Sequence, residues 1–227
     1  WGSNINQLAL LTRPNEKALS EANKVLQMLG AVNEQLEITK DGRLLSKIPL
    51  HPRLARIILA GGKDATLLAS VLSNADPLNN MNSSDINIRI AAIKNYQKQK
   101  SDSSYSLRVP IIKGIMKEIS RLSKHLTNQS NYTVAQLAAL AYPDRIGKRR
   151  KGEMPRYILS NGKGAIMAES DPLRSTPFLV ACNLDGNLQE AKLRQFVPIT
   201  LSEIKELFGN QIFSIQTCEW SKRQQKV

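Results

Sequence analysis

The chain has 227 residues, of which 41% are hydrophobic, so it is long enough to bury one large core or two to three small ones. It carries 32 Lys and Arg residues against 19 Asp and Glu residues, and the formal charge of +13 favours a polyanionic partner, nucleic acid before acidic membrane. No apolar run approaches the roughly 18 residues of a membrane-spanning helix, and no signal-peptide pattern opens the sequence. We therefore expect a soluble, cytoplasmic protein without a membrane partner.

Two further features of the composition concern the context of the chain. It begins with Trp1-Gly2 rather than Met, and a helix-like pattern follows at once, which predicts a fragment of a longer protein. Cys182 and Cys218 are too few for a disulfide framework or a zinc site, so a reducing cytoplasm fits.

The first 50 residues predict a helix and a short hairpin. Apolar residues between 16 and 29 recur at steps of three and four, and Gly30 follows them, which predicts a helix that ends there. Short β-prone segments flank the turn Lys40-Asp41-Gly42, so a hairpin, or wing, is expected over 36–48. Because a helix followed by a wing is typical of a winged helix, we predict a partial winged-helix unit at 1–50.

Residues 51–128 predict a helical bundle. Two short helices are expected on either side of Gly61-Gly62, and longer ones follow over 85–98 and 111–126. A polar stretch, 97–106, indicates an exposed connection within the bundle.

Residues 129–227 predict a β-rich unit that a helix over 133–141 introduces. Five short segments bounded by turn residues are candidate strands, and one more helix is expected near 202–208. Five strands with one helix suit a small OB-like β-barrel, so the whole chain is predicted to be an α+β multidomain protein. The candidate strands are 156–159, 165–168, 178–184, 192–196 and 212–218.

No pattern in the sequence indicates catalysis by this chain alone. Gly61-Gly62-Lys63-Asp64 lacks the first Gly and the hydroxyl residue of a phosphate-binding loop, so a helix break is favoured. Asn161-Gly162-Lys163-Gly164 could hold a phosphate on backbone N–H groups, with Lys163 as the charge, although a hairpin turn is favoured. His51 and His125 lack a neighbouring nucleophile and are interpreted as structural or surface residues. We predict no catalytic residue, metal ligand or cofactor in the chain.

The basic residues are the main candidates for a binding site. Five cations lie within seven residues where the helical region meets the β unit, a density that repels itself unless an anion is near. Four more lie on the face of helix 111–126 opposite its apolar side, which indicates a face turned to water or phosphate. Cations paired with phosphates release counterions, so binding would be strong, salt-sensitive and poorly sequence-specific. The first group is Arg145, Lys148, Arg149, Arg150 and Lys151, and the second is Lys113, Lys117, Arg121 and Lys124.

Two smaller groups leave alternatives open. Arg53 and Arg56, near the start of a bundle helix, either contact nucleic acid or fix the wing against the bundle. Aromatic residues make up only 5% of the chain, so base stacking would depend on a few rings that can equally belong to the core. These rings are Tyr142, Tyr157, Phe178 and Trp220.

Several sequence blocks resemble the region that follows the motor of DEAH-type helicases, and the bacterial HrpB family in particular. Their order and spacing match over nearly the whole chain, and the two most specific are Leu50-His51-Pro52-Arg53-Leu54-Ala55-Arg56 and Tyr142-Pro143-Asp144-Arg145. The sequence departs from the family pattern at Asn74 and Asn183, where charged or smaller residues are expected. The other matching blocks are 26–32, 72–78, 157–165, 171–173 and 178–186.

The resemblance implies an ATP-dependent RNA helicase whose two RecA-like motor domains, which would bind ATP and Mg, lie before residue 1. In such helicases the winged helix, a ratchet-like helical bundle and an OB-like domain pack against the motor and close a channel over a single strand. The implied partners are single-stranded RNA, with DNA left open, and the motor itself. The alternative is a protein-interaction platform whose cationic face docks an acidic partner. A free-standing hydrolase is disfavoured, because no nucleophile, metal cluster or phosphate loop is evident.

Overall fold

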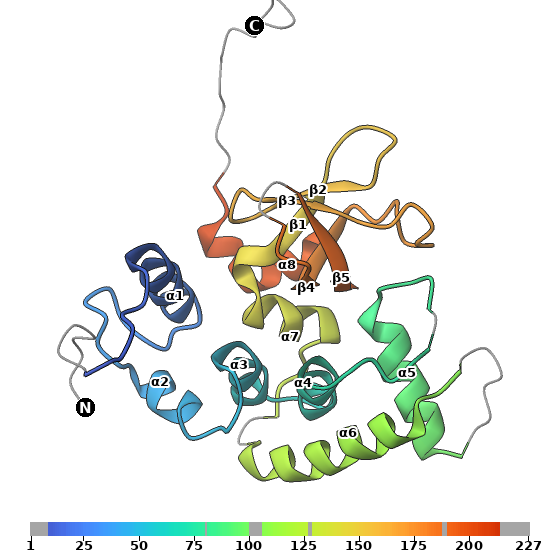
Figure 1. Ribbon diagram of the computed structural model, residues 1–227, viewed down its shortest axis with the longest axis horizontal. Helices are drawn as coiled ribbons and strands as arrows, with labels where there is room; N and C mark the ends of the chain where they lie inside the picture. The colour runs from blue at the N-terminus through green and yellow to red at the C-terminus, as the bar shows by residue number, and fades with distance from the viewer. Residues whose placement is uncertain (1–8, 80, 100–105, 127–128, 188–189, 214–227) are drawn as a thin grey trace, which may run out of the picture.

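The computed structural model describes residues 9–79, 81–99, 106–126, 129–187 and 190–213, and it combines a helical half with a closed β-barrel (Figure 1). The predicted α+β class is confirmed. None of the helices in these ranges is long and apolar enough to cross a membrane. The α-helices are α1 (Glu16–Met28), α2 (Lys40–Leu45), α3 (Pro52–Ala60), α4 (Ala65–Ser73), α5 (Ile86–Gln97), α6 (Val109–Leu122), α7 (Val134–Ala141) and α8 (Leu201–Phe208). The strands are β1 (Ile146–Arg149), β2 (Arg156–Leu159), β3 (Gly164–Ile166), β4 (Phe178–Leu184) and β5 (Glu190–Pro198). Short 3-10 turns are η2 (Ser123–His125), η3 (Pro143–Arg145) and η4 (Gly209–Gln211).

The predicted hairpin over 36–48 is wrong, because α2 occupies its second half. The Thr39 side chain accepts a hydrogen bond from the N–H of Gly42 at 2.9 Å and donates one to the carbonyl oxygen of Gly30 at 2.6 Å, so it starts a helix rather than a turn. A side chain at Gly42 would collide with the backbone of Ala31, since a Cβ there would lie 1.9 Å from the Ala31 carbonyl oxygen. The one strand-like contact is the isolated bridge between Val32 and Ile38.

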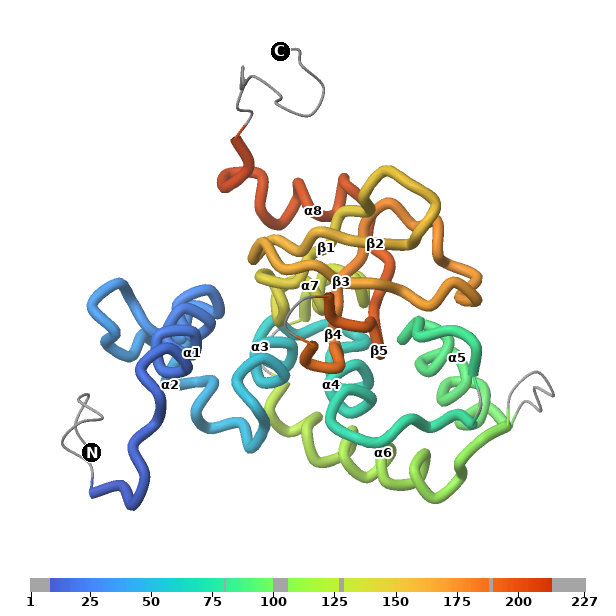
Figure 2. Tube along the Cα trace, turned by 45° about the horizontal axis from the view of Figure 1, so that its top comes forward, coloured from blue at the N-terminus to red at the C-terminus, as the bar shows by residue number. Residues whose placement is uncertain are grey.

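The helical half is built around α3 and α4. Pro52 occupies the first turn of α3, where its missing N–H costs nothing, and Gly61 ends the helix at a φ of 78°. Gly62 follows, and α4 begins at Ala65, as the helix-break interpretation predicts. α4 packs on α3, α6 and α7, while α5 extends toward β5 (Figure 2).

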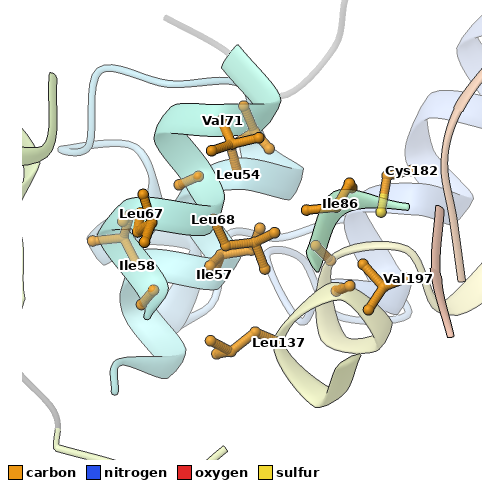
Figure 3. Packing of buried hydrophobic residues seen from close by; sticks show 14 of the residues in the cluster. Leu54, Ile57, Ile58, Leu67, Leu68, Val71, Ile86, Leu137, Cys182 and Val197 are labelled. Atoms are coloured by element: carbon orange, nitrogen blue, oxygen red, sulfur yellow. The ribbon is translucent and has the colours of Figure 1, made fainter. Parts of the chain in front are cut away.

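One hydrophobic core joins the helices to the barrel. Leu68 of α4 and Leu137 of α7 belong to the same buried cluster as Val197 of β5 and Cys182 of β4 (Figure 3). A second cluster, which includes Tyr157 and Phe196, fills the barrel itself. The predicted boundaries at 50 and 128 stay predictions.

The barrel closes in the order β1-β2-β3-β5-β4. β3 and β5 are parallel, and all the other neighbouring strands are antiparallel. The predicted strands at 156–159 and 178–184 match β2 and β4 residue for residue, whereas β3 and β5 begin earlier than predicted.

Two strand predictions differ from the structure. β1 lies inside the basic run and was not predicted as a strand, because three of its four residues are Gly, Lys and Arg. A strand over 212–218 is wrong for Ile212 and Phe213, which follow η4 outside any strand, and residues 214–218 lie outside the described residues.

The segment before α5 fastens the helical half to the barrel. The N–H of Phe196 donates to the carbonyl oxygen of Ser84 at 3.1 Å. The buried carboxylate of Asp171 accepts hydrogen bonds from the N–H of Ser84 at 2.9 Å and from the hydroxyl of Ser83 at 3.3 Å. Ser84 lies 87 positions from Asp171, so these bonds join segments that are distant in the sequence and fix the two halves together.

Candidate nucleic-acid interface

A groove of about 1000 Å³ separates α1 from one end of the barrel. One wall is α1, and the other is formed by the loops after β2 and β4, with the start of α3 and η3 at the floor. The view in Figure 2 shows α1 standing to the side of the barrel that carries these loops. The polar residues that line the groove are Glu21, Lys24, His51, Arg53, Asp144, Arg145, Asn161, Lys163, Asn183 and Asn187.

Arg53 is committed to a structural ion pair at the groove floor. Its guanidinium donates to the two carboxylate oxygens of Asp144 at 2.6 and 2.9 Å and to the carbonyl oxygen of Ala141 at 2.9 Å. The Arg53 and Asp144 side chains are only 8% and 11% exposed. Because its charge is paired with Asp144 and its side chain is nearly buried, we leave Arg53 out of the set of proposed nucleic-acid contacts.

Arg145 keeps its charge available to the groove. Its guanidinium carbon lies 5.4 Å from the centre of the Tyr142 ring, and that of Arg53 lies 5.0 Å from the same ring. The Arg145 side chain is 29% exposed, and its ion pair with Asp144 is long, at 3.8 Å. Burial raises the pKa of Tyr142, so the ring stays neutral and supports both cations. Arg145 is therefore a cation held in place with little neutralisation.

His51 lines the groove as a neutral donor or acceptor. Its Nδ1 accepts the N–H of Arg53 at 3.3 Å and so caps α3. His51 is exposed overall, but partial burial of its ring, followed by the charges of Arg53 and Arg145, lowers its pKa. The neutral imidazole then carries its proton on Nε2, because Nδ1 is the acceptor.

Lys163 lies on the β2–β3 turn at the rim of the groove. Gly162 has a φ of 82°, and the side chain of Asn161 accepts the N–H of Lys163 at 3.0 Å, which confirms the hairpin-turn interpretation. The Lys163 side chain is exposed, so its charge is free to approach a ligand. A phosphate bound by the backbone of this turn stays a prediction.

The basic run 145–151 does not form one patch. Arg145 lies in η3 at the groove, whereas Arg150 follows β1 at the end away from the groove, and at about 3.3 Å per residue the strand between them spans roughly 10 Å. Arg149 is partly buried and donates to the carbonyl oxygens of Arg174 at 3.1 Å, Gly152 at 3.2 Å and Glu153 at 3.4 Å. It holds the β1–β2 loop in place, whereas Lys148, Arg150 and Lys151 are exposed on the barrel.

The remaining basic candidates lie elsewhere. Arg56 contacts Asp41 at 3.2 Å and ties α3 to α2, which is the alternative that the sequence left open. On α6, Lys113 and Lys117 are exposed, whereas Arg121 pairs with Glu118 at 2.6 Å. α6 packs on α4 along the edge of the molecule opposite the barrel, so its basic face is a separate surface (Figure 1).

Sequence reasoning missed the amide side chains of the groove and Lys24 on α1. Asn161 and Asn187 come from two loops and Asn183 from the end of β4, which the barrel brings together, and no spacing in the sequence indicates this. Among the residues that the structure describes, no group of three or more His, Cys, Asp or Glu side chains could hold a metal ion.

The sequence is similar to parts of known RNA helicases. The winged-helix description of the helicase-associated domain, HA2, matches residues 24–50, so the winged-helix interpretation holds although the expected hairpin does not. The Escherichia coli ATP-dependent RNA helicase HrpB is 25% identical over 99% of this chain, and the chain spans 26% of its length. A probable ATP-dependent RNA helicase of Saccharomyces cerevisiae, DHR1, is 38% identical over 34% of this chain and 6% of its own length.

Solved structures agree with the sequence comparison. The crystal structure of the E. coli DExH-box NTPase HrpB superposes on 99% of this chain with a TM-score of 0.75 at 24% identity, and the chain covers 26% of it. A second crystal structure of E. coli HrpB, described as a DEAH/RHA helicase, gives a TM-score of 0.69. The whole-length match, the shared fold and the helicase-associated segment together make this chain similar to the C-terminal region of a DEAH-box helicase of the HrpB type.

Proposed function

We propose that the groove between α1 and the barrel binds single-stranded RNA and forms one wall of a strand channel beside a RecA-like motor. The observation that carries this proposal is the position of Arg145, a partly exposed cation fixed over Tyr142 and directed into a groove that Lys163 borders. Among the described residues of the groove lining, the one acid besides the neutralised Asp144 is Glu21, on the opposite wall. The described lining is therefore positive where a phosphate would lie.

The chemistry of the groove suits a strand with little sequence preference. Arg145 and Lys163 would neutralise phosphates, while the amide of Asn161 and the Nε2–H of His51 offer hydrogen bonds to ribose or base edges. Neither cation is arranged as a paired donor for one base edge, so affinity would come from the RNA backbone.

The barrel supports an OB-like assignment within this proposal. Its strand order and its single parallel pair, β3 with β5, fit a five-stranded Greek-key barrel of the kind that binds oligonucleotides. The helices from α3 to α6 would act as the ratchet-like bundle. ATP and Mg would belong to the motor, and the location would be cytoplasmic.

Fluorescence anisotropy of labelled single-stranded RNA across a salt series tests the proposal. Wild type is compared with Arg145→Gln/Lys163→Gln, and with Lys113→Gln/Lys117→Gln as a control that removes the same charge from α6. We expect the groove variant to bind more weakly and its salt slope to fall by about 1.4, since each phosphate contact on a single strand contributes about 0.7. The α6 control should keep the wild-type slope.

Three outcomes would overturn the proposal. The folded wild type fails to bind RNA, the groove variant binds like wild type, or the α6 control loses as much affinity as the groove variant. An acidic peptide that binds the groove of the folded wild type, when RNA does not, would favour the protein-interaction platform instead.

A further inference from the structure

We propose that the outer face of the barrel is a second RNA site, which binds the backbone of a double-stranded segment. This inference rests on the proposed function only in taking RNA as the polyanion, and it concerns a surface that the groove does not include. The face is defined by a row of residues across four segments, Arg150, Arg156, Ile166 and Lys192, which we call the barrel row.

The strand register places these residues side by side. Arg149 is opposite Tyr157 in the β1–β2 pair, so the next position, Arg150, is opposite Arg156, and the N–H of Arg150 donates to the carbonyl oxygen of Arg156 at 2.8 Å. Across the following pairs, Arg156 is opposite Ile166, and Ile166 is opposite Lys192. Neighbouring strands lie about 4.8 Å apart, so the barrel row spans roughly 14 Å.

The side chains of the barrel row point away from the barrel interior. Each alternates with a neighbour that is buried inside, namely Tyr157 at 0%, Ala165 at 0% and Ala191 at 7% exposure. The Arg156 side chain is 50% exposed, and Lys192 is exposed as well. The helical half contacts β4 and the α7-facing end of β5, so it leaves this part of the barrel open.

The charge of this face is not balanced within the described residues. Like charges directly opposite on adjacent strands are destabilising, so Arg150 beside Arg156 costs stability unless an anion is near. Glu190 contacts Arg156 at 3.1 Å, and the charge of Lys192 acts on the carboxyl group of Asp185, but exposed interactions of this kind contribute little and leave the face positive. Lys148, one row away on the same face, adds a further exposed charge.

The shape and chemistry of the face favour a duplex over a single strand. The barrel row contains Ile166 near its centre and no aromatic ring. In the next row of outward-facing positions, which begins at Lys148, the central residues are Ile158 and Gly164. Phe178 borders Lys148 but packs against the helical core. Without stacking rings, bases of a single strand gain little, whereas duplex RNA is recognised through its phosphates and 2′-hydroxyls.

The two sites lie at different places on the barrel, which gives them complementary roles. The groove is at the β2–β3 turn, and the barrel row ends at the β1–β2 loop, which extends away from α1 in both views (Figures 1 and 2). An RNA with a single strand in the groove could therefore rest its adjoining duplex on the barrel row.

Anisotropy with a blunt RNA duplex of about 16 base pairs, roughly the length that a double-strand-binding domain spans, tests this inference. The variant Arg150→Gln/Arg156→Gln/Lys192→Gln is compared with Lys113→Gln/Lys117→Gln/Lys124→Gln, which removes three charges from α6. We expect the barrel-row variant to lose at least about tenfold in duplex affinity and to lower the salt slope by about 2.7, from about 0.9 per phosphate. Glu190→Gln should bind the duplex more tightly, and circular dichroism should show each variant folded.

The outcomes separate this inference from the groove proposal. Duplex affinity that is unchanged in the barrel-row variant, or lowered equally by the α6 control, would overturn the second site. So would a folded wild type that binds an acidic peptide at this face and no duplex. If the barrel-row variant loses duplex affinity and keeps single-strand affinity, the second site stands whether or not Arg145→Gln/Lys163→Gln affects the single strand.

Discussion

The guanidinium of Arg53 lies 2.6 and 2.9 Å from the two carboxylate oxygens of Asp144, although 91 positions separate the two residues in the sequence. The pair joins the start of α3 to η3. The guanidinium groups of Arg53 and Arg145 both pack over the ring of Tyr142. The floor of the groove is thus a chain of contacts in which a buried ion pair positions the ring, and the ring positions the cation that we propose for RNA.

Breaking the Arg53–Asp144 pair should strongly destabilise the protein. Arg53→Ala leaves a nearly buried carboxylate without its partner, so we expect a loss of about 3–5 kcal/mol in the free energy of unfolding. Replacing both residues, as in Arg53→Met/Asp144→Leu, should cost less than the single change, because no unpaired charge remains. Urea denaturation of the two single variants and the double variant measures this coupling. Additive losses would contradict it.

The sequence predicted the helices well because their information is local. α3 and α4 follow from apolar spacing and from Gly61-Gly62 between them, and the same holds for α6 and α8. The hairpin over 36–48 failed because the turn-like Lys40-Asp41-Gly42 becomes the first turn of α2 once Thr39 can bond back to Gly30, a contact that spacing does not reveal.

The site was predicted less well because it depends on distant contacts. The density of cations from Arg145 to Lys151 indicated a patch, but a strand alternates its side chains and carries them along its length, so Arg145 and Arg150 end on different surfaces. The sequence around Arg53 is compatible with a surface cation, and only the fold brings Asp144 next to it. Lys163 and Asn187 meet at the groove only because the barrel closes.

Asp171 should be required for the junction between the helical half and the barrel. Asp171→Asn turns one acceptor oxygen into a donor facing the N–H of Ser84 or Leu173, so we expect a loss of about 1–3 kcal/mol. Hydrogen exchange at the N–H groups of Ser84 and Phe196 should speed up in the same variant. The exposed neighbour Glu169→Gln is the control and should change neither quantity. Protection of both amides that equals wild type would refute this role.

Arg149 and Arg150 are adjacent in sequence but should behave differently. Arg149→Gln removes three bonds to loop carbonyls and should lower stability by about 1–2 kcal/mol, while single-stranded RNA affinity stays near wild type. Arg150→Gln should leave stability within about 0.5 kcal/mol and weaken duplex binding instead. Denaturation midpoints and anisotropy, measured on both variants, make the comparison. A loss of duplex affinity in Arg149→Gln and a loss of stability in Arg150→Gln would contradict these assignments.

His51 should make stability depend on pH in the weakly acidic range. Its pKa in the folded protein lies below the ordinary value of 6.5, so the folded state binds its proton less readily than the unfolded chain does. The contribution of His51 is therefore fully present above about pH 6.5, and it is lost as the pH falls through the folded pKa, when Nδ1 can no longer accept the N–H of Arg53. His51→Asn keeps a cap and removes the titration. We expect wild type to lose up to about 1 kcal/mol relative to His51→Asn between pH 7 and pH 5, since the side chain is exposed and the cap is one bond. Urea denaturation of both proteins at several pH values measures the difference, and a gap that stays constant with pH would show that folding does not lower the pKa of His51.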